Sequence, residues 1–508
     1  MTVEFTKDHS SNGIEWTLQY DASCSLFTHP RQLSASALMS DFQPVDPSNA
    51  RILELGCATG GNLTPIAGSL PYSECIGIDP FAAQIEIAQM RADRSGISNV
   101  TYLPIGVSDL DRLEGKFDYI IAHGLFSWIS DEHREDTLQL CFEKLNDHGL
   151  AYISFNTYPG WHQREIVRNL VCWQKRLLDK RVISEDQKDK DAKLIKESRL
   201  ALKFFSQNAL KQDMKGCREL LAQIETDISK FPDWYLAHEY LLEHNQPLYF
   251  ERFLELIHAH QLTYLCDASS NVHLASHFLS AMSLRELHLM TDKPLDVEQG
   301  IDFLLNRTLR RAIITKRPQE ERQFLCPPYV WSEPSKEGVD RRLNQELFVA
   351  SPYKPMSEIN NISDVTSYGS QTIPGEQMII NQPAENVIMI LLSTIWPDSL
   401  SIDQLMKQSA QLLFEFGRED LVGTLSLALN TLIVRGHIYQ PTWGIMGQSD
   451  ESQGESHSLL PWIRGGSTEQ VKNLTNRYHC PVFLNANEMK AINEQRQHDQ
   501  LKALGLLH

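Results

Sequence analysis

The chain has 508 residues, of which 42% are hydrophobic and 22% charged, and its formal net charge is -18; this suits a globular protein of about two to four domains. The acidic balance disfavours a nucleic-acid partner and favours a small molecule or a basic protein segment. No apolar run approaches the ~20 residues that span a bilayer and no signal peptide opens the chain, so we expect a cytoplasmic protein without a membrane segment.

The most informative segment is residues 51–62, in which apolar residues lead through an acid into a turn of small residues. A helix-compatible run, residues 63–70, follows it, and a second apolar run, residues 74–78, ends in Asp79. A strand, a tight turn and a helix in that order let backbone N–H groups approach a nucleoside cofactor closely. An acid about 20 residues further on is placed to bind ribose hydroxyls.

Two cofactors fit this turn. Gly56, Ala58 and Gly61 form a degenerate dinucleotide fingerprint. Gly56, Ala58 and Gly60 instead match the E-x-G-x-G-x-G turn of S-adenosylmethionine-dependent methyltransferases, with alanine in the middle. Glu54 separates the two, because an acid at the end of the first strand would repel a pyrophosphate but suits the cationic methionine half of S-adenosylmethionine. We therefore expect S-adenosylmethionine as the cofactor.

Strands and helices continue to alternate after Asp79, which predicts a parallel, doubly wound sheet. The predicted elements are a helix at residues 82–94, strands at 100–105 and 117–123, a helix at 132–145 and a strand at 150–156.

The cofactor-binding candidates lie in the turn, at the ends of the first, second and fourth strands, after the third strand and in the N-terminal segment. The side chain of Asp109 has the alternative role of a helix cap. Cys57 lies in the cofactor turn, but we do not expect it to be a nucleophile, because methyl transfer needs none. The nine cysteines of the chain lack a C-x-x-C pair, so we expect no metal site. The candidates are Tyr20, Glu54, Gly56, Cys57, Ala58, Gly60, Asn62, Asp79, Val107, Ser108, Asp109 and His123.

The catalytic candidates form an aromatic slot for the methyl acceptor after the fourth and fifth strands. A structural histidine is the alternative for His123, packing is the alternative for Asn156, Tyr158 and Trp161, and for His162 packing is the favoured role. His238 and Tyr240, further along the chain, could reach the same slot from above. The candidates are His123, Phe126, Trp128, Asn156, Tyr158 and Trp161.

The sheet is predicted to be interrupted and then resumed. Residues 163–245 read as charged helices, and a helix at 250–260 precedes strands at 262–267 and 308–316. We expect these to be the antiparallel sixth and seventh strands of the sheet, with the helices inserted over the active site. An independent helical domain is the alternative.

The C-terminal part has a different pattern. Residues 354–377 are rich in Ser, Asn, Pro and Gly and read as an exposed connection. Helices at 385–394, 402–414 and 421–435, then a short strand after Gly436, suggest a winged-helix-like unit. Residues 425–432 of its last helix include no Lys or Arg, so we expect protein contact or a structural role rather than DNA binding. Residues 447–458 read as a polar loop.

Several segments carry a family resemblance. They are residues 53–62 (LELGCATGGN), 117–128 (FDYIIAHGLFSW), 156–162 (NTYPGWH), 236–241 (LAHEYL) and 245–250 (NQPLYF). The chain resembles the bacterial class I methyltransferases that carry a methyltransferase regulatory domain, a group that includes protein-lysine methyltransferases acting on outer-membrane proteins. The likeness runs from about Tyr20 to Arg317, and more weakly through residues 461–483.

The resemblance implies a Rossmann-like α/β sheet of seven strands, followed by a mainly helical, winged-helix-like domain. The expected domains are residues 1–334 (core 50–162 and about 246–320, with a helical regulatory insertion at about 165–245) and 335–508, winged-helix-like around 385–445. The expected activity is methyl transfer from S-adenosylmethionine to lysine in a protein. A small-molecule methyltransferase with a helical lid, and a catalytically weak recruitment module, are the alternatives; a homodimer is left open.

Overall fold

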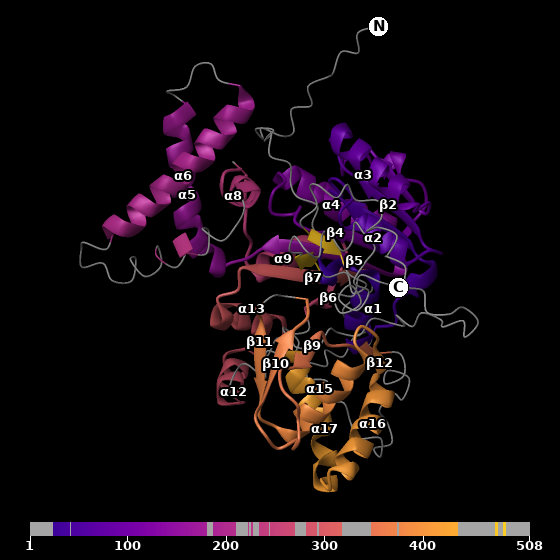
Figure 1. Ribbon diagram of the computed structural model, residues 1–508. Helices are drawn as coiled ribbons and strands as arrows, with labels where there is room; N and C mark the ends of the chain where they lie inside the picture. The colour runs from indigo at the N-terminus through magenta and orange to yellow at the C-terminus, as the bar shows by residue number, and fades with distance from the viewer. Residues whose placement is uncertain are drawn as a thin grey trace.

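The computed structural model describes residues 24–40, 42–179, 186–209, 222, 225–226, 233–242, 244–269, 281–291, 294–316, 347–372, 375–434, 473–475 and 481–483. Figure 1 shows a sheet domain, a pair of helices that projects from it, and a C-terminal domain on its other side. Tyr20, the polar loop at 447–458 and the strand predicted after Gly436 lie outside the described residues. In the described part of the chain, no helix combines the length and the apolar character needed to cross a membrane.

A seven-stranded sheet forms the centre of the first domain, with the strand order β3-β2-β1-β4-β5-β7-β6. Its strands are β1 (Arg51–Leu55), β2 (Glu74–Ile78), β3 (Val100–Leu103), β4 (Phe117–Ala122), β5 (Leu145–Asn156), β6 (Thr263–Asp267) and β7 (Leu309–Thr315). This is the predicted Rossmann-like class I methyltransferase sheet. One detail of the prediction is wrong: β7 is antiparallel to both β5 and β6, so β6 runs parallel to β1–β5 and only β7 is reversed.

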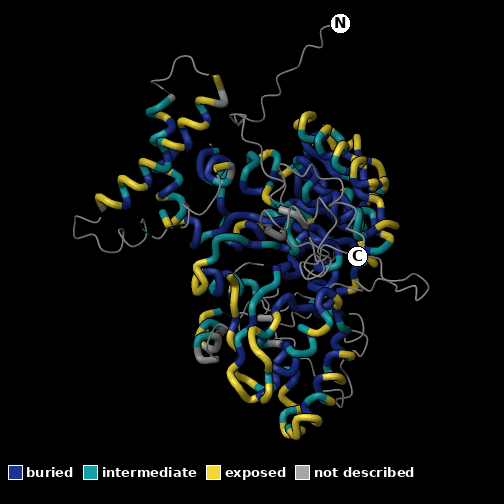
Figure 2. The backbone as a smooth tube through the Cα atoms, in the orientation of Figure 1, coloured by how far each residue is buried: buried dark blue, intermediate teal, exposed yellow. Residues whose placement is uncertain are grey.

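Helices cover both faces of the sheet, and the strands are buried between them (Figure 2). The helices α1 (Pro30–Met39), α2 (Leu63–Ser69) and α3 (Ala82–Ser95) pack on one face, and α4 (Asp131–Lys144) and α9 (Phe250–Ala259) on the other. On α9, Phe250, Phe253 and Ile257 follow helical spacing and are fully buried against the sheet.

The inserted segment is helical, as predicted. Its helices are α5 (Gly160–Asp179), α6 (Gln187–Ala209) and α8 (Asp233–Tyr240), and α5 and α6 project from the sheet domain (Figure 1). They have a small core of their own, in which Val167 and Val171 of α5 meet Leu194 of α6 and Leu236 of α8. The insertion therefore packs as a unit and brings α8 close to the sheet.

The C-terminal domain contains the predicted helices as α15 (Pro383–Ile395), α16 (Ile402–Glu415) and α17 (Leu425–Val434). The short strand β12 (Leu400–Ser401) pairs with β8 (Phe348–Val349), and Ser401 and Gln404 form a capping box on α16. The exposed connection predicted at 354–377 is instead part of an antiparallel sheet of β9 (Tyr353–Pro355), β10 (Thr366–Ser370) and β11 (Gln377–Ile380). Its alternate residues, such as Tyr368 and Met378, enter the core of this domain.

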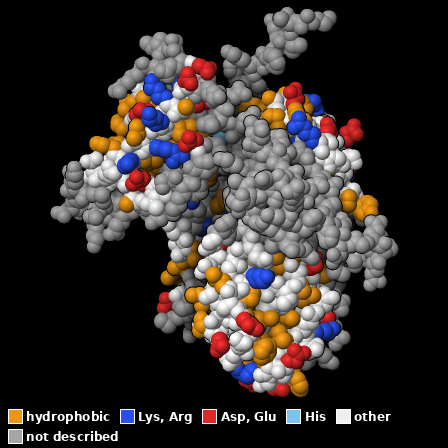
Figure 3. All heavy atoms as spheres, viewed as in Figure 1, with side chains coloured by type: hydrophobic (Ala, Val, Ile, Leu, Met, Phe, Trp, Pro, Cys, Tyr) orange, Lys and Arg blue, Asp and Glu red, His pale blue; other side chains and the backbone are white. Residues whose placement is uncertain are grey.

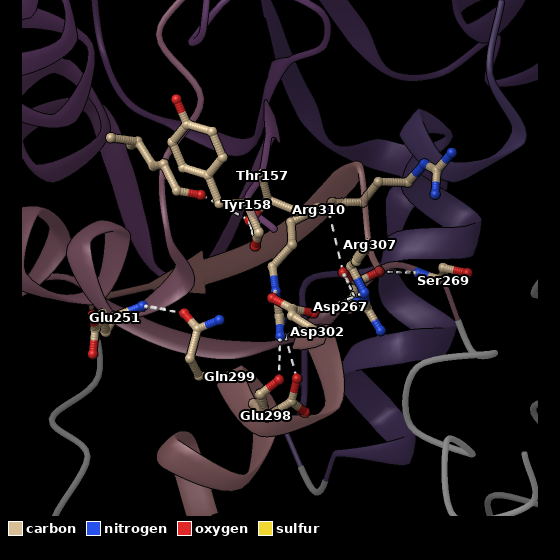
Figure 4. A network of polar contacts seen from close by, with 12 residues as sticks. Thr157, Tyr158, Glu251, Asp267, Ser269, Glu298, Gln299, Asp302, Arg307 and Arg310 are labelled. Carbon is tan, nitrogen blue, oxygen red and sulfur yellow. Dashed lines mark hydrogen bonds and ion pairs between the residues drawn. The ribbon is translucent and has the colours of Figure 1, made fainter. Parts of the chain in front are cut away.

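A buried ion cluster fixes β7 to α13 (Pro294–Leu305). The Arg310 guanidinium is fully buried, and its Nε donates to Asp302 at 2.7 Å and its Nη1 to Glu298 at 3.0 Å (Figure 4). It also lies 3.7 Å from the ring centroid of Phe250. The two carboxylates raise the pKa of Arg310 in spite of its burial. The cluster keeps the buried charge of Arg310 paired, so the loss of one partner should lower the free energy of unfolding.

We expect Arg310→Met to lower the free energy of unfolding by about 3–5 kcal/mol, because Asp302 and Glu298 would lose their buried cation. Arg252→Met is the matched control, since Arg252 forms an exposed pair with Glu255 on α9 and should cost under about 1 kcal/mol. Urea denaturation of the two variants measures the difference. Equal losses would show that the buried cluster adds nothing beyond a surface pair.

We propose that residues 1–334 fold as one domain, with the helices at about 165–245 as an insertion. Because residues 151–156 of β5 pair with β7, a fragment of residues 1–245 would leave this part of β5 as an exposed edge and should be insoluble or molten. A fragment of residues 1–334 should stay folded and bind S-adenosylhomocysteine in calorimetry. A folded, cofactor-binding fragment of residues 1–245 would refute the insertion.

Candidate functional site

The turn after β1 has a backbone that only small residues adopt easily. Gly56, Ala58 and Gly60 have φ of +68°, +46° and +71°, in the left-handed region that costs a residue with a Cβ. At Gly60, a Cβ would also lie 2.6 Å from the Tyr102 hydroxyl oxygen. The turn is thus compressed against the sheet and exposes its backbone at the end of β1, which suits the close approach of a nucleoside.

Glu54 and Asn62 join this turn to the N-terminal segment. Asn62 Nδ2 donates to Glu54 Oε1 at 2.7 Å, and Asn62 Oδ1 accepts from the Thr28 hydroxyl at 2.8 Å. Burial raises the pKa of Glu54 to about 8. A cation bound beside Glu54 would favour its ionised form, so the residue fits the positively charged methionine half of S-adenosylmethionine.

Asp79 closes the turn from the end of β2. Its Oδ2 accepts from the Ala58 N–H at 3.1 Å and its Oδ1 from the Phe81 N–H at 3.0 Å. The side chain is buried, and burial raises its pKa. Each carboxylate oxygen has a further lone pair, so Asp79 can hold the turn and still accept from ribose hydroxyls.

The three candidates after β3 differ in orientation. Val107 is buried in the core beside Ile105. The Ser108 hydroxyl donates to Asp136 at 2.5 Å. The Asp109 carboxylate accepts from the Gly106 N–H at 2.8 Å. The side chains of Ser108 and Asp109 thus already have hydrogen-bond partners within the protein. The backbone of this loop can therefore contact the adenine base.

A cavity of about 670 Å³ lies at the carboxyl ends of β4 and β5, where the sheet meets the insertion. Figure 3 shows a hollow between the projecting helices and the body of the domain. The wall is built from the ends of β4, β5 and β6, the entry to β7, and the helices α5 and α8. Its residues are His123, Gly124, Trp128, Ser154, Asn156, Arg164, Tyr235, Glu239, Asp267, Leu305, Asn306, Arg307, Thr308, Leu309 and Arg311.

His123 is held at the inner wall by two hydroxyls. Its Nδ1 lies 3.0 Å from the Tyr152 hydroxyl and 3.2 Å from Ser154 Oγ, which itself accepts from the Gly124 N–H at 2.8 Å. Burial, together with the charge of Arg311, lowers the pKa of His123 to about 4. The ring is therefore neutral at pH 7, and the two hydroxyls hold it at Nδ1.

Of the other predicted acceptor residues, Trp128 and Asn156 line the cavity. Asn156 Nδ2 donates to Asn245 Oδ1 at 3.0 Å, which ties β5 to the end of the insertion. Phe126 was predicted to line the acceptor slot, but it is fully buried and packs edge-on against Phe253. It therefore belongs to the core of the domain.

Tyr158 and Trp161 stand behind the cavity wall rather than in it. Trp161 is 1% exposed and packs edge-on against Trp128, with ring centroids 6.4 Å apart. The Tyr158 hydroxyl donates to Glu165 at 2.5 Å, and the Tyr158 ring stacks on His162 at 4.1 Å. His162 therefore has the packing role that the sequence favoured.

The insertion supplies polar groups that the sequence analysis missed. It selected His238 and Tyr240, but Tyr240 is buried in the core of the insertion. Tyr235 and Glu239, four residues apart on α8, share the face that lines the cavity. Burial raises the pKa of Glu239 to about 7, opposed by the charge of Arg164. Helical spacing within the family motif at 236–241 was the signal that could have identified Glu239.

Two sequence families match the chain. One, described as a methyltransferase domain, matches residues 52–149, and the other, described as a predicted methyltransferase regulatory domain, matches residues 232–316. The second match includes β6 and β7, so the regulatory family contributes strands to the central sheet.

Relatives and solved structures agree with these matches. An uncharacterised protein of Rickettsia prowazekii is 34% identical over 45% of this chain and 87% of its own length. A second protein of that organism is 26% identical over 82% of this chain and 72% of its own length. The structure of PKMT2 from Rickettsia typhi in complex with AdoHcy is similar with a TM-score of 0.74 and 23% identity, covering 92% of this chain and 87% of that one.

The fold, the glycine turn with its acid and these matches lead to one assignment. The chain belongs to the class I S-adenosylmethionine-dependent methyltransferases that carry a methyltransferase regulatory domain.

Proposed function

We propose that this methyltransferase transfers the methyl group of S-adenosylmethionine to a lysine side chain of a protein. The observation that carries the proposal is the position of Glu239, an acid in a cavity that also contains Trp128 and Tyr235. An acid in a cavity that also has aromatic side chains in its wall suits an amine that arrives as a cation. The similarity in fold to PKMT2, a protein lysine methyltransferase, supports the same acceptor.

In this proposal the turn after β1 holds the cofactor. Asp79 accepts hydrogen bonds from the ribose hydroxyls, and the backbone around Val107 contacts adenine. Glu54, through Asn62, faces the methionine half. His123 lies at the end of β4 and lines the cavity, where its neutral ring can hydrogen-bond with the reacting groups. S-adenosylmethionine supplies an already activated sulfonium methyl group, so the residues need only align the acceptor and exclude water.

The acceptor must lose a proton before it can attack. With a free pKa of ~10.4, presenting a neutral lysine amine at pH 7 costs roughly 4–5 kcal/mol. We propose that Glu239 takes this proton, since a carboxylate with a pKa of about 7 is suited to act as a base near neutral pH. Trp128 and Tyr235 desolvate the amine, which lowers its pKa, and their ring faces can hold the methylated cation.

A small-molecule acceptor is the second candidate. The cavity volume of about 670 Å³ is in the range of small-ligand pockets. Incubating a lysate from a deletion strain with the enzyme and methyl-labelled cofactor separates the two, since the label should appear at lysine Nζ of a protein. Label confined to metabolites or to protein carboxylates would overturn the lysine assignment.

Asp79→Asn should weaken S-adenosylhomocysteine binding by roughly 10- to 100-fold, because the charge-assisted bonds to the ribose are lost. The ligand-induced rise in melting temperature should fall accordingly, and NAD should cause no rise in either protein. Asp93→Asn, an exposed substitution on α3, is the control. An unchanged response of Asp79→Asn to S-adenosylhomocysteine would remove Asp79 from the site.

Glu239→Gln should alter the pH dependence of methyl transfer to the labelled protein acceptor. In the native enzyme the rate should rise with pH through about 7, as Glu239 loses its proton, and then level off. In the variant the rate should fall by about 10²- to 10⁴-fold and keep rising toward the free amine pKa of ~10.4.

Glu86→Gln is the control for this experiment, because Glu86 is an exposed acid on α3. It should leave both the rate and the pH profile unchanged. The role of Glu239 would be contradicted if Glu239→Gln retained the native profile.

A further inference from the structure

Three arginines line the cavity, and they differ in how their charges are balanced. Arg307 Nε lies 2.8 Å from Asp302 and its Nη1 3.5 Å from Asp267. Arg164 is coupled to Glu239 and hydrogen bonded to Tyr235. Within the described ranges, the Arg311 guanidinium has neither an ion pair nor a hydrogen bond, and its Nε is buried without a partner. Of the three cavity arginines, Arg311 is thus the one whose charge has no paired acid among the described residues.

The alternation of β7 places this cation. Arg311 stands opposite Ser154 on β5, on the face where Tyr152 and Ser154 reach His123. Its neighbour Arg310 points to the other face, into the ion cluster with Asp302 and Glu298 (Figure 4). A shift of one residue would exchange the two side chains. The pairing of Arg310 therefore holds Arg311 at the cavity.

The surroundings of Arg311 are arranged for a ligand rather than for a protein partner. Its guanidinium lies 4.5 Å from the ring centroid of Phe27, in the N-terminal segment that also contacts Asn62. The Asp267 carboxylate accepts from the backbone N–H groups of Arg311 and Ser269 and pairs with Arg307, but it forms no ion pair with the Arg311 guanidinium. Neutral His123 cannot balance the charge. Stacking on Phe27 orients the planar guanidinium of Arg311 and leaves its N–H groups available to donate to a ligand.

We propose that Arg311 is a carboxylate-binding residue of the active site. A guanidinium of this kind pairs best with a carboxylate through two parallel hydrogen bonds. Two carboxylates can reach it: the amino-acid end of the cofactor, since Phe27 connects Arg311 to the cofactor turn, and a carboxylate of the acceptor in the cavity. The inference is independent of whether the acceptor is lysine.

The test compares ligands that differ only in this carboxylate. Binding of S-adenosylmethionine and of its decarboxylated analogue is measured by calorimetry, without turnover, for the native enzyme and for Arg311→Met, which keeps the apolar stem on Phe27. If Arg311 binds the cofactor, native affinity should be roughly 10- to 100-fold weaker for the analogue, and Arg311→Met should bind both ligands equally weakly.

If Arg311 binds the acceptor, Arg311→Met should keep cofactor affinity and raise the acceptor KM by a similar factor. Arg311→Lys, which retains the charge, should restore part of either loss; it also serves as the second variant if Arg311→Met does not fold. Arg252→Met, which removes a remote surface cation, should have no effect. Unchanged cofactor affinity together with an unchanged acceptor KM in the folded variant would overturn the proposal.

Discussion

The return of the chain as β7, between β5 and β6, is the constraint on which the rest of this structure depends. It completes the sheet with a single reversed strand, and it can do so only in one register because its two arginines need different environments. Arg310 requires the buried carboxylates of α13, and that requirement orients Arg311 toward the cavity. The buried cluster of Arg310 with its two carboxylates is stabilising only when it is complete. By fixing the register of β7, it also places the positive charge of Arg311 at the site.

The site combines two regions with separate tasks. The compressed turn after β1, tied by Asn62 to the N-terminal segment, is built for an adenosyl cofactor. The insertion and the entry to β7 surround a cavity at the same edge of the sheet. Because the sulfonium methyl is already activated, transfer to the lysine acceptor that we propose would depend on alignment, desolvation and the removal of one acceptor proton. Neutral His123 and weakly acidic Glu239 are suited to that task.

Much of this could be predicted from the sequence, because apolar periodicity and glycine spacing are local signals. They located the strands of the sheet and the turn at Gly56–Gly60. The direction of β6 could not be predicted, since it depends on β7 pairing with two strands that are distant in sequence. Phe126 was misplaced because a ring after a strand can face the core or the cleft with the same local pattern. The sequence did not indicate roles for Arg311 and Glu239, because segments that are distant in sequence form their environments. The small sheet at residues 353–380 was missed because its strands are only three to five residues long and are separated by polar segments.

The central claim is that the cofactor turn and the cavity beneath α8 form one active site for a lysine side chain. A crystal structure with S-adenosylhomocysteine and a lysine-containing substrate peptide tests it most directly. The account predicts ribose hydroxyls on Asp79, the sulfur atom facing the cavity beside His123, and the lysine amine between Trp128 and Glu239. A sulfur atom turned away from the cavity, or a peptide lysine bound at another surface, would contradict it.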